Sequence, residues 1–237
     1  MKYGFFITGT DTGVGKTRVS AALLTAFNAR GFSTAAMKPI ASGCINTPQG
    51  LRNDDALVLQ QYASLPLTYQ QVNPYAFEPA IAPHIAAEQA GQVIDFARIK
   101  HGLDILSAQA DVVIVEGVGG WLVPLKRDAT IADLAHILGL PVILVVGMRL
   151  GCLNHALLSA QSIEQSGLPF IGWVANVIDP AMLCIEENIE ALRERIAAPW
   201  LGTVEWDTLA APGEVAHQLR VTFGVWPFAV TALNLSG

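Results

Sequence analysis

The segment GTDTGVGKT, residues 9–17, constrains the fold of this chain more than any other. It follows an apolar run at residues 3–8 and precedes a pattern of helical period that begins at residue 16. A buried strand, a glycine-rich turn and a helix in this order build an anion site, because the first N–H groups of the helix lack partners and its dipole favours negative charge. Phosphate-binding loops usually read G-x-x-x-x-G-K-[ST]. Here the first glycine, Gly9, stands one residue too early and Thr10 takes its place.

Two kinds of phosphate site compete for this segment. A dinucleotide site needs a third glycine three residues after Gly15 and an acid near the end of the second strand. This chain has Arg18 and the pair Met-Lys at residues 37–38 instead. A nucleoside-triphosphate site needs Gly15 for close backbone approach, Lys16 for the β- and γ-phosphates and Thr17 for magnesium. We therefore favour the triphosphate site over a dinucleotide site and over a plain glycine turn that caps a helix.

The periodicity predicts an α/β fold with one mainly parallel sheet and helices on both faces. Short Val- and Ile-rich runs alternate with longer helical segments, and no linker or repeat interrupts residues 1–237, so we expect a single domain. The expected strands are 3–8, 33–37, 111–116, 141–147 and 170–176, and the expected helices are 16–30, 54–63, 95–109, 130–138, 154–166 and 181–197. Ligands bind beyond the carboxyl ends of the strands in such sheets.

Three local features refine this prediction. Asp179 and Pro180 are suited to start the last helix, and Thr130 with Asp133 forms a capping pair for an earlier one. Residues 39–53, rich in Gly, Ser, Asn and Pro, are expected to form a long functional loop without regular structure.

Composition excludes several classes of function. The formal net charge is −6 and no segment concentrates Lys and Arg, which argues against nucleic acid or an anionic membrane as a partner. The longest apolar run, residues 140–146, is far below the roughly 20 residues of a membrane-spanning helix, and no signal-peptide pattern opens the chain. Three widely spaced cysteines without a C-x-x-C motif suit a reducing compartment, so we expect a cytoplasmic protein.

Charged residues stand at the ends of two further predicted strands. Taken alone, Lys38 would be interpreted as a surface lysine. Next to a phosphate-binding loop it is a candidate second cation, which can screen negative charge on the reacting groups. Glu116 ends a buried strand, where a carboxylate is costly unless it is paired or binds a metal. Asn53 and Asp54 are good helix N-caps, and on chemistry alone either Asp54 or Asp55 suits magnesium.

Two later strand ends offer polar groups to a ligand. The N–H groups at the start of the helix near residues 151–154 are suited to bind a carboxylate, although a plain capped helix fits as well. Asn176 ends another strand and can both donate to and accept from a base edge. The five histidines lack metal-ligand spacing, and we expect His84 to be structural.

The loop G-T-D-T-x-V-G-K-T resembles that of the dethiobiotin synthetase family, in which the arc is one residue longer than usual. The resemblance continues in register from residue 4 to about residue 206, through MKPIASG (37–43), GLRNDDAL (50–57), NPYAFEPAIAPHIAA (73–87), VVIVEGVGGWLVPL (112–125), VVGMRLGCLNH (145–155) and WVANVIDP (173–180). It implies a P-loop fold and the ATP-dependent closure of 7,8-diaminopelargonic acid with CO2 to a cyclic urea, in biotin synthesis. Magnesium would be the cofactor, and a homodimer would hold the substrate at its interface.

The resemblance also implies a role for each site residue. The catalytic residues would be Lys16, Lys38 and Thr12, and the magnesium ligands Thr17, Asp55 and Glu116. Nucleotide would contact Gly13, Val14, Gly15, Lys16, Thr17, Arg18, Asp55, Glu116, Gly117, Val118, Gly119, Asn176, Val177, Glu205, Trp206 and Asp207. Substrate would contact Ser42 and, from the partner subunit, Gly151, Cys152, Leu153 and Asn154. The family usually has a proline where this chain has Glu205, which leaves the nucleotide preference open.

Two other classes of P-loop protein are weaker matches. Switch proteins of the partitioning or septum-positioning kind carry an additional lysine in K-G-G-x-x-x-G-K-T, whereas this chain reads Thr8-Gly9-Thr10. The amidation enzymes of corrin synthesis need an added glutamine-hydrolysing domain, for which these 237 residues leave no room. Dependence of ATP hydrolysis on a diamine and bicarbonate would separate a synthetase from a switch.

Overall fold

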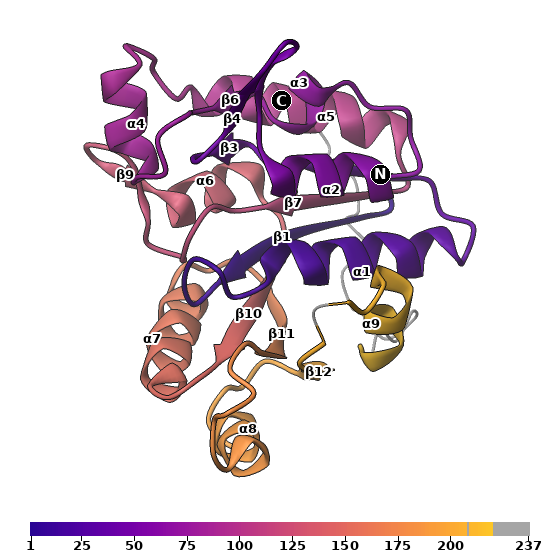
Figure 1. Ribbon diagram of the computed structural model, residues 1–237, viewed down its shortest axis with the longest axis vertical. Helices are drawn as coiled ribbons and strands as arrows, with labels where there is room; N and C mark the ends of the chain where they lie inside the picture. Colours follow the sequence, from indigo (N-terminus) through magenta and orange to yellow (C-terminus); the bar gives the residue numbers. More distant parts are fainter. Residues whose placement is uncertain (208, 220–237) are drawn as a thin grey trace.

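A six-stranded, all-parallel sheet forms the centre of the computed structural model, which describes residues 1–207 and 209–219 (Figure 1). The strand order is β12-β11-β10-β1-β7-β2. The bounds are β1 Tyr3–Gly9, β2 Thr34–Met37, β7 Val112–Glu116, β10 Val142–Met148, β11 Phe170–Val177 and β12 Trp200–Val204. Because all six run in the same direction, their carboxyl ends meet at one edge of the sheet.

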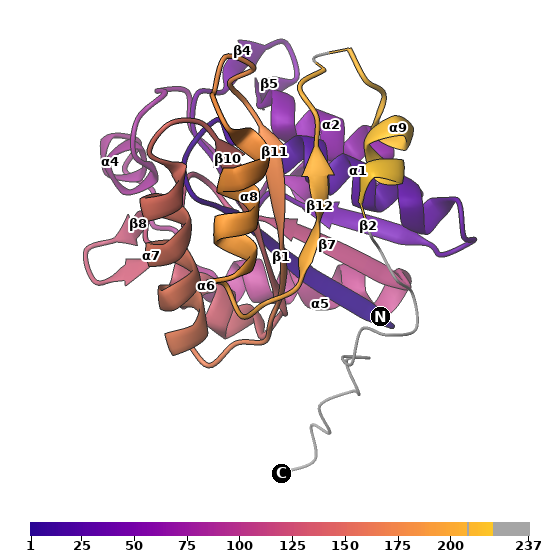
Figure 2. The ribbon, with the colours of Figure 1, turned by 90° about the horizontal axis from the view of Figure 1, so that it is seen from below.

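Helices cover both faces of this sheet (Figures 1 and 2). On one face α1 (Lys16–Asn28) packs against α9 (Pro212–Gln218), and on the other lie α5 (Phe96–Gln109), α6 (Ile131–Leu138), α7 (Cys152–Gln165) and α8 (Ile185–Arg193). Three shorter helices, α2 (Asp54–Tyr62), α3 (Tyr69–Val72) and α4 (Pro83–Gln89), accompany the segments between β2 and α5. The predicted α/β class is thus confirmed.

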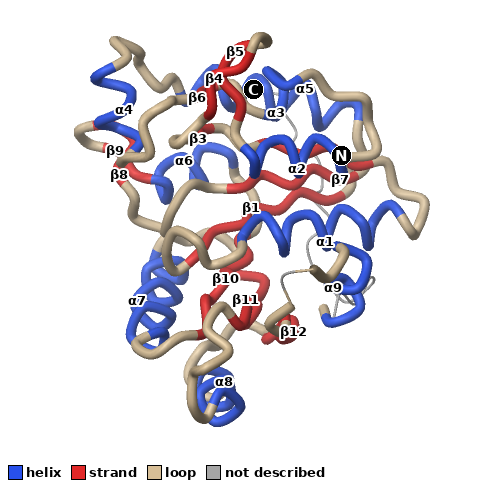
Figure 3. Tube along the Cα trace, in the orientation of Figure 1, coloured by secondary structure: helices blue, strands red, loops and turns tan. Residues whose placement is uncertain are grey.

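Three two-stranded ladders complete the described structure. They are β3 (Ile40–Ala41) with β6 (Tyr75–Ala76), β4 (Ile45–Thr47) with β5 (Gly50–Arg52), and β8 (Pro124–Lys126) with β9 (Ala129–Thr130). The prediction of an irregular loop over residues 39–53 is therefore wrong, because β4 and β5 form an antiparallel hairpin there. Figure 3 shows the loops after β1 and β7 side by side at the end of the sheet.

The other local predictions have mixed outcomes. The capping pair is confirmed, since Asp133 accepts a hydrogen bond from the backbone N of Thr130 at 2.6 Å. The start of the last long helix was placed too early: α8 begins at Ile185, and Asp179 instead accepts from the backbone N of Ala181 in a turn. Strand β12 was not predicted. Within the described residues, no helix has both the length and the apolar character needed to cross a membrane.

Candidate active site

The glycine-rich loop connects β1 to α1 and is closed by an asparagine from a distant strand. Gly15 adopts a left-handed conformation with φ of 85°, and the helix starts at the next residue. Asn176, at the end of β11, donates from Nδ2 to the backbone O of Val14 at 2.8 Å. A Cβ on Gly15 would lie only 2.1 Å from that Nδ2. Glycine is thus required here both by the backbone angle and by the asparagine packed against it.

Glu116 is fully buried at the end of β7 and accepts hydrogen bonds on both of its carboxylate oxygens. Lys38 Nζ lies 2.6 Å from Oε1, and the Thr17 hydroxyl donates to the same oxygen at 2.8 Å. The Ser20 hydroxyl donates to Oε2 at 2.8 Å. Strand register explains the first contact: Met37 pairs with Val115, so the residues that follow them, Lys38 and Glu116, are neighbours.

Asp55 forms the second ion pair of Lys38. Asn53 caps α2 by accepting from the backbone N of Ala56 at 3.2 Å, which places Asp55 in the first turn. Its Oδ2 lies 2.9 Å from Lys38 Nζ. Asp54, the alternative that the sequence left open, is exposed. Burial alone would lower the pKa of Lys38, but the negative charges of Glu116 and Asp55 outweigh it and raise that pKa, so Lys38 stays charged.

Lys16 is the second buried cation of the site. Its ammonium donates to the backbone O of Asp11 at 3.0 Å, so it curls back over the loop. Burial, followed by the positive charge of Lys38, lowers its pKa from 10.5 to about 8. A phosphate bound by the glycine-rich loop would raise the pKa of Lys16 again, because its negative charge favours the protonated lysine.

This pKa predicts how nucleotide affinity depends on pH. Below pH 8 Lys16 is already charged, so affinity for a non-hydrolysable ATP analogue is expected to be constant. Above pH 8 binding must take up a proton, and the Kd is expected to rise about tenfold per pH unit. Calorimetric titrations between pH 7 and 9.5 measure this. Lys16→Arg is the control, because its guanidinium stays charged throughout and its affinity curve should be flat. A flat curve for the unmodified protein would contradict the prediction.

Most of the predicted phosphate and carbamate residues line one cavity of about 280 Å³. Its lining is Thr12, Gly13, Gly15, Lys16, Thr17, Lys38, Ala41, Ser42, Asn53, Asp55, Val118 and Gly119. The Ser42 hydroxyl is buried and has no hydrogen-bond partner among the described residues. Glu116 lies behind the wall of this cavity, in contact with Thr17 and Lys38. Gly117 is buried against Phe6, so it serves packing at this point.

Other predicted residues lie outside this cavity. Gly151, Cys152, Leu153 and Asn154 start α7, and Glu205, Trp206 and Asp207 follow β12 as exposed residues. Glu205 is one residue past Val204, which pairs with Asn176, so it lies at the same sheet edge as the loop. Val177 is buried within β11, and Arg18 follows Thr17 on α1.

The sequence interpretation missed two polar contacts in this region. Ser20 lies three residues after Thr17 on α1, and this spacing on one helix face could have pointed to a shared partner. Arg149 pairs with Asp11 of the glycine-rich loop at 2.6 Å. That pair joins segments 138 residues apart, and no local pattern signals it.

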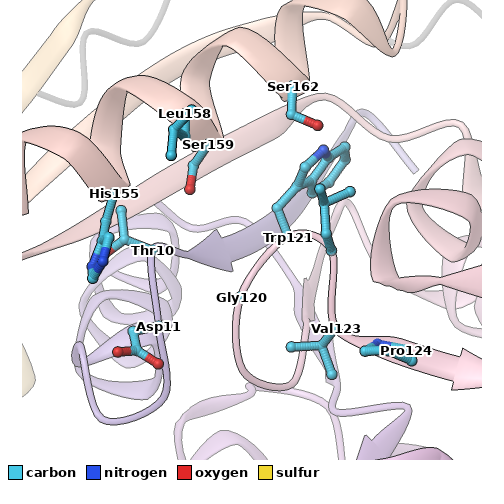
Figure 4. Close-up of a pocket in the computed structure, with 11 residues that line it drawn as sticks. Thr10, Asp11, Gly120, Trp121, Val123, Pro124, His155, Leu158, Ser159 and Ser162 are labelled. Atoms are coloured by element: carbon cyan, nitrogen blue, oxygen red, sulfur yellow. The ribbon is translucent and has the colours of Figure 1, made fainter.

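A larger cavity of about 480 Å³ adjoins the loop on the side of α7 (Figure 4). Figure 4 shows side chains of α7, including His155 and Ser159, facing the segment that carries Trp121 and Val123. Leu122 and Leu158 also line this cavity, and each is about 60% exposed. Apolar side chains thus reach the surface between the loop and α7.

Comparison with known proteins places this site in a family. Residues 3–213 match a family model described as an AAA domain. The chain is 56% identical over 216 residues to the ATP-dependent dethiobiotin synthetase of Pseudomonas paraeruginosa, covering 91% of this chain and 95% of that one. It is 52% identical to the enzyme of the same name from Cellvibrio japonicus, covering 93% and 97%.

A solved structure with the same fold is the septum site-determining protein MinD of Pyrococcus horikoshii in complex with Mg-ADP. The TM-score is 0.51 at 18% identity, over 93% of this chain and 88% of that one. At this identity the likeness concerns the fold alone. The sequence identities to the synthetases, spread over nine tenths of the chain, are decisive: the chain belongs to the family of the ATP-dependent dethiobiotin synthetases.

Proposed function

We propose that this chain closes 7,8-diaminopelargonic acid with CO2 to dethiobiotin at the expense of ATP. The observation that carries the proposal is the convergence of two buried lysines, Lys16 and Lys38, on one cavity bordered by the triphosphate loop. The carbamate that attacks the γ-phosphate of ATP is an anion, as is the γ-phosphate itself. Two neighbouring cations suit this reaction, because they screen the repulsion between the carbamate and the γ-phosphate.

The chemistry proceeds through three bond-forming steps. One amine nitrogen attacks CO2 and loses a proton, which gives a carbamate. A carbamate oxygen then attacks the γ-phosphorus while the bond to the ADP oxygen breaks. Finally the second amine attacks the carbamoyl carbon, phosphate leaves with the electron pair of the C–O bond, and the amine loses a proton. Lys38 holds the carbamate next to Lys16, which faces the phosphates, and the Ser42 hydroxyl and Thr12 orient the reacting groups.

Thr17, Asp55 and Glu116 supply the donors for magnesium. Hydroxyl and carboxylate oxygens are the hard ligands that Mg²⁺ prefers, and Thr17 and Asp55 both line the cavity, so these two residues fit. Glu116 lies directly behind them and accepts from the Thr17 hydroxyl, so it adds its negative charge to the site. Bound magnesium would neutralise charge on the phosphates. Lys38 keeps Asp55 ionised, since burial raises the pKa of Asp55 but the charge and hydrogen bond of Lys38 outweigh this and lower it.

Glu116→Gln is expected to raise the Mg²⁺ concentration for half-maximal turnover by about tenfold or more. The amide keeps the size of the side chain but loses the negative charge that attracts the cation. Diamine-dependent phosphate release, titrated with Mg²⁺ at fixed ATP, measures the change. The exposed Glu186, changed to Gln, serves as the control. A magnesium titration that Glu116→Gln leaves unchanged would reject Glu116 as part of the metal site.

The base and the substrate carboxylate occupy the remaining predicted positions. Asn176 Oδ1 is buried and has no partner among the described residues, so it is available to an adenine amino group while Nδ2 holds Val14. Glu205, Trp206 and Asp207 border the base from β12.

The N–H groups of Gly151–Asn154 bind the carboxylate of a substrate held by the partner subunit of a homodimer. Exposed Leu122, Leu150 and Leu158 suit such an interface.

The experiment that tests this function measures phosphate release with Mg-ATP and bicarbonate, with and without 7,8-diaminopelargonic acid, and detects dethiobiotin by mass. Diamine-dependent turnover with product supports the proposal. Slow ATP hydrolysis at a rate independent of the diamine contradicts it and favours a switch protein.

Sedimentation of the purified protein tests the dimer. We also place the enzyme in the cytosol, which suits its three free cysteines.

A further inference from the structure

The backbone of Lys38 is held from outside the central sheet. β2 ends at Met37, and the backbone N of Lys38 donates to the O of Val72 at 2.8 Å. The backbone O of Lys38 accepts from Asn73 Nδ2 at 2.7 Å, and the same amide donates to the O of Tyr75 at 3.1 Å. Asn73 is only 3% exposed. The position of Lys38 beyond the end of its strand thus depends on the Asn73 side chain.

A tyrosine connects this asparagine to the helix that carries Asp55. The Tyr69 hydroxyl donates to Asn73 Oδ1 at 2.9 Å and accepts from the backbone N of Asn53 at 2.8 Å. Asn53 is the N-cap of α2, and Asp55 lies in the first turn. Because Asp55 also reaches Lys38 Nζ at 2.9 Å, the contacts form a closed ring through Lys38, Asn73, Tyr69, Asn53 and Asp55.

Each hydrogen bond in this ring has only one possible direction. A backbone N–H can only donate, so the Tyr69 oxygen accepts from Asn53 and its proton points to Asn73 Oδ1. The two backbone carbonyls can only accept, so Asn73 must turn Nδ2 toward them. Burial raises the pKa of the Tyr69 hydroxyl, which therefore keeps the proton that it donates. Tyr69 and Asn73 thus specify each other's orientation.

We infer that Tyr69 and Asn73 are positioning residues, which set the separation between the Lys38 ammonium and Asp55 by joining the end of β2 to the start of α2. The inference rests on the proposed roles of Lys38 and Asp55. The Asp55 side chain is 46% exposed, and an ion pair with one exposed partner holds its geometry weakly in water. The buried network supplies the rigidity that the ion pair lacks, and misplacing a reacting group by about 1 Å costs on the order of a hundredfold in rate.

Tyr69→Phe tests the inference, and the chain provides a closely matched control in Tyr75→Phe. The Tyr75 hydroxyl also accepts from the backbone N of an N-cap residue, Asp95 of α5, at 2.9 Å. Both rings are buried, and each carries an arginine over its face, Arg52 at 4.2 Å and Arg98 at 5.0 Å. Both variants therefore lose one part-buried hydrogen bond to a helix start. Tyr69→Phe also loses the bond to Asn73, because only the Tyr69 hydroxyl belongs to the ring around Lys38.

We expect Tyr69→Phe to lower kcat by about ten- to a hundredfold and to change the Kd of ATP by less than about twofold. Tyr75→Phe should leave both values unchanged. Thermal unfolding of each variant sets an assay temperature at which both are folded. Equal kcat values for the two variants would overturn the inference. Asn73→Asp, which turns a carboxylate toward the Lys38 carbonyl, provides a second test and should also lower kcat with little change in ATP affinity.

A double-mutant cycle with Asp55→Asn separates positioning from a general structural effect. If Tyr69 acts through the Lys38–Asp55 pair, adding Tyr69→Phe to Asp55→Asn should lower kcat by less than about twofold further. The same fold loss in both backgrounds would show independent effects and overturn the inference. Absence of diamine-dependent turnover in the unmodified protein would instead contradict the proposed function, and full turnover in Asp55→Asn and Lys38→Met would contradict only the roles assigned to these two residues, so the failures are distinguishable.

Discussion

Lys38→Met is expected to lower turnover about a thousandfold and to destabilise the fold as well. Lys38 Nζ lies between Glu116 and Asp55, at 2.6 and 2.9 Å from their carboxylate oxygens, and Lys38 and Glu116 are both buried. Without the ammonium, the carbamate loses its cation and Glu116 becomes a buried, unpaired charge. Breaking such a pair costs about 3–5 kcal/mol of unfolding free energy. Ring closure at saturating ATP and thermal unfolding by circular dichroism measure the two losses.

The double variant Lys38→Met/Glu116→Gln distinguishes these effects. Glutamine at position 116 can still accept hydrogen bonds from Thr17 and Ser20 but brings no charge that needs compensation. Stability is therefore expected to return most of the way, whereas turnover should remain lost. Recovery of turnover in the double variant would show that Lys38 only neutralises Glu116. Its assignment to the carbamate chemistry would then be wrong.

Gly15→Ala is expected to weaken ATP binding by about a hundredfold or more. Its φ of 85° is strained for any residue with a Cβ, and that Cβ would lie 2.1 Å from Asn176 Nδ2. The Asn176 side chain cannot move away from this Cβ without losing its hydrogen bond to the O of Val14. Strain and a lost buried hydrogen bond each cost about 1–3 kcal/mol, and 1.4 kcal/mol is tenfold in affinity. Calorimetry with a non-hydrolysable ATP analogue measures the loss.

Gly31→Ala is the matched control for this substitution. Gly31 has a similar φ of 81°, but no described atom lies within 4 Å of the added Cβ. The backbone penalty of about 1 kcal/mol or more should therefore lower stability without changing ATP affinity. Unchanged affinity in Gly15→Ala, or an equal loss in both variants, would show that the contact between Gly15 and Asn176 does not shape the loop.

The local patterns of the sequence were sufficient to predict much of the fold. Five of the six strands in the described part of the sheet were expected, because buried parallel strands are continuous apolar runs. The glycine-rich loop and the Thr130–Asp133 cap were recognised because their residues are close in the chain. β12 was missed, since Gly202 interrupts the apolar run of Trp200–Val204, and glycine weakens a strand pattern. The hairpin of β4 and β5 was missed because its residues resemble loop composition.

The sequence by itself determined the family and the residue types of the site, because both depend on motifs read along the chain. Only the tertiary structure decided how those residues meet. Lys38 and Glu116 are 78 positions apart, and they are neighbours because β2 and β7 pair in one particular register. A shift of one residue would turn each side chain to the opposite face of the sheet. The ring through Tyr69 and Asn73 likewise depends on the packing of α2 and α3 beside β2, and no local sequence pattern predicts that packing.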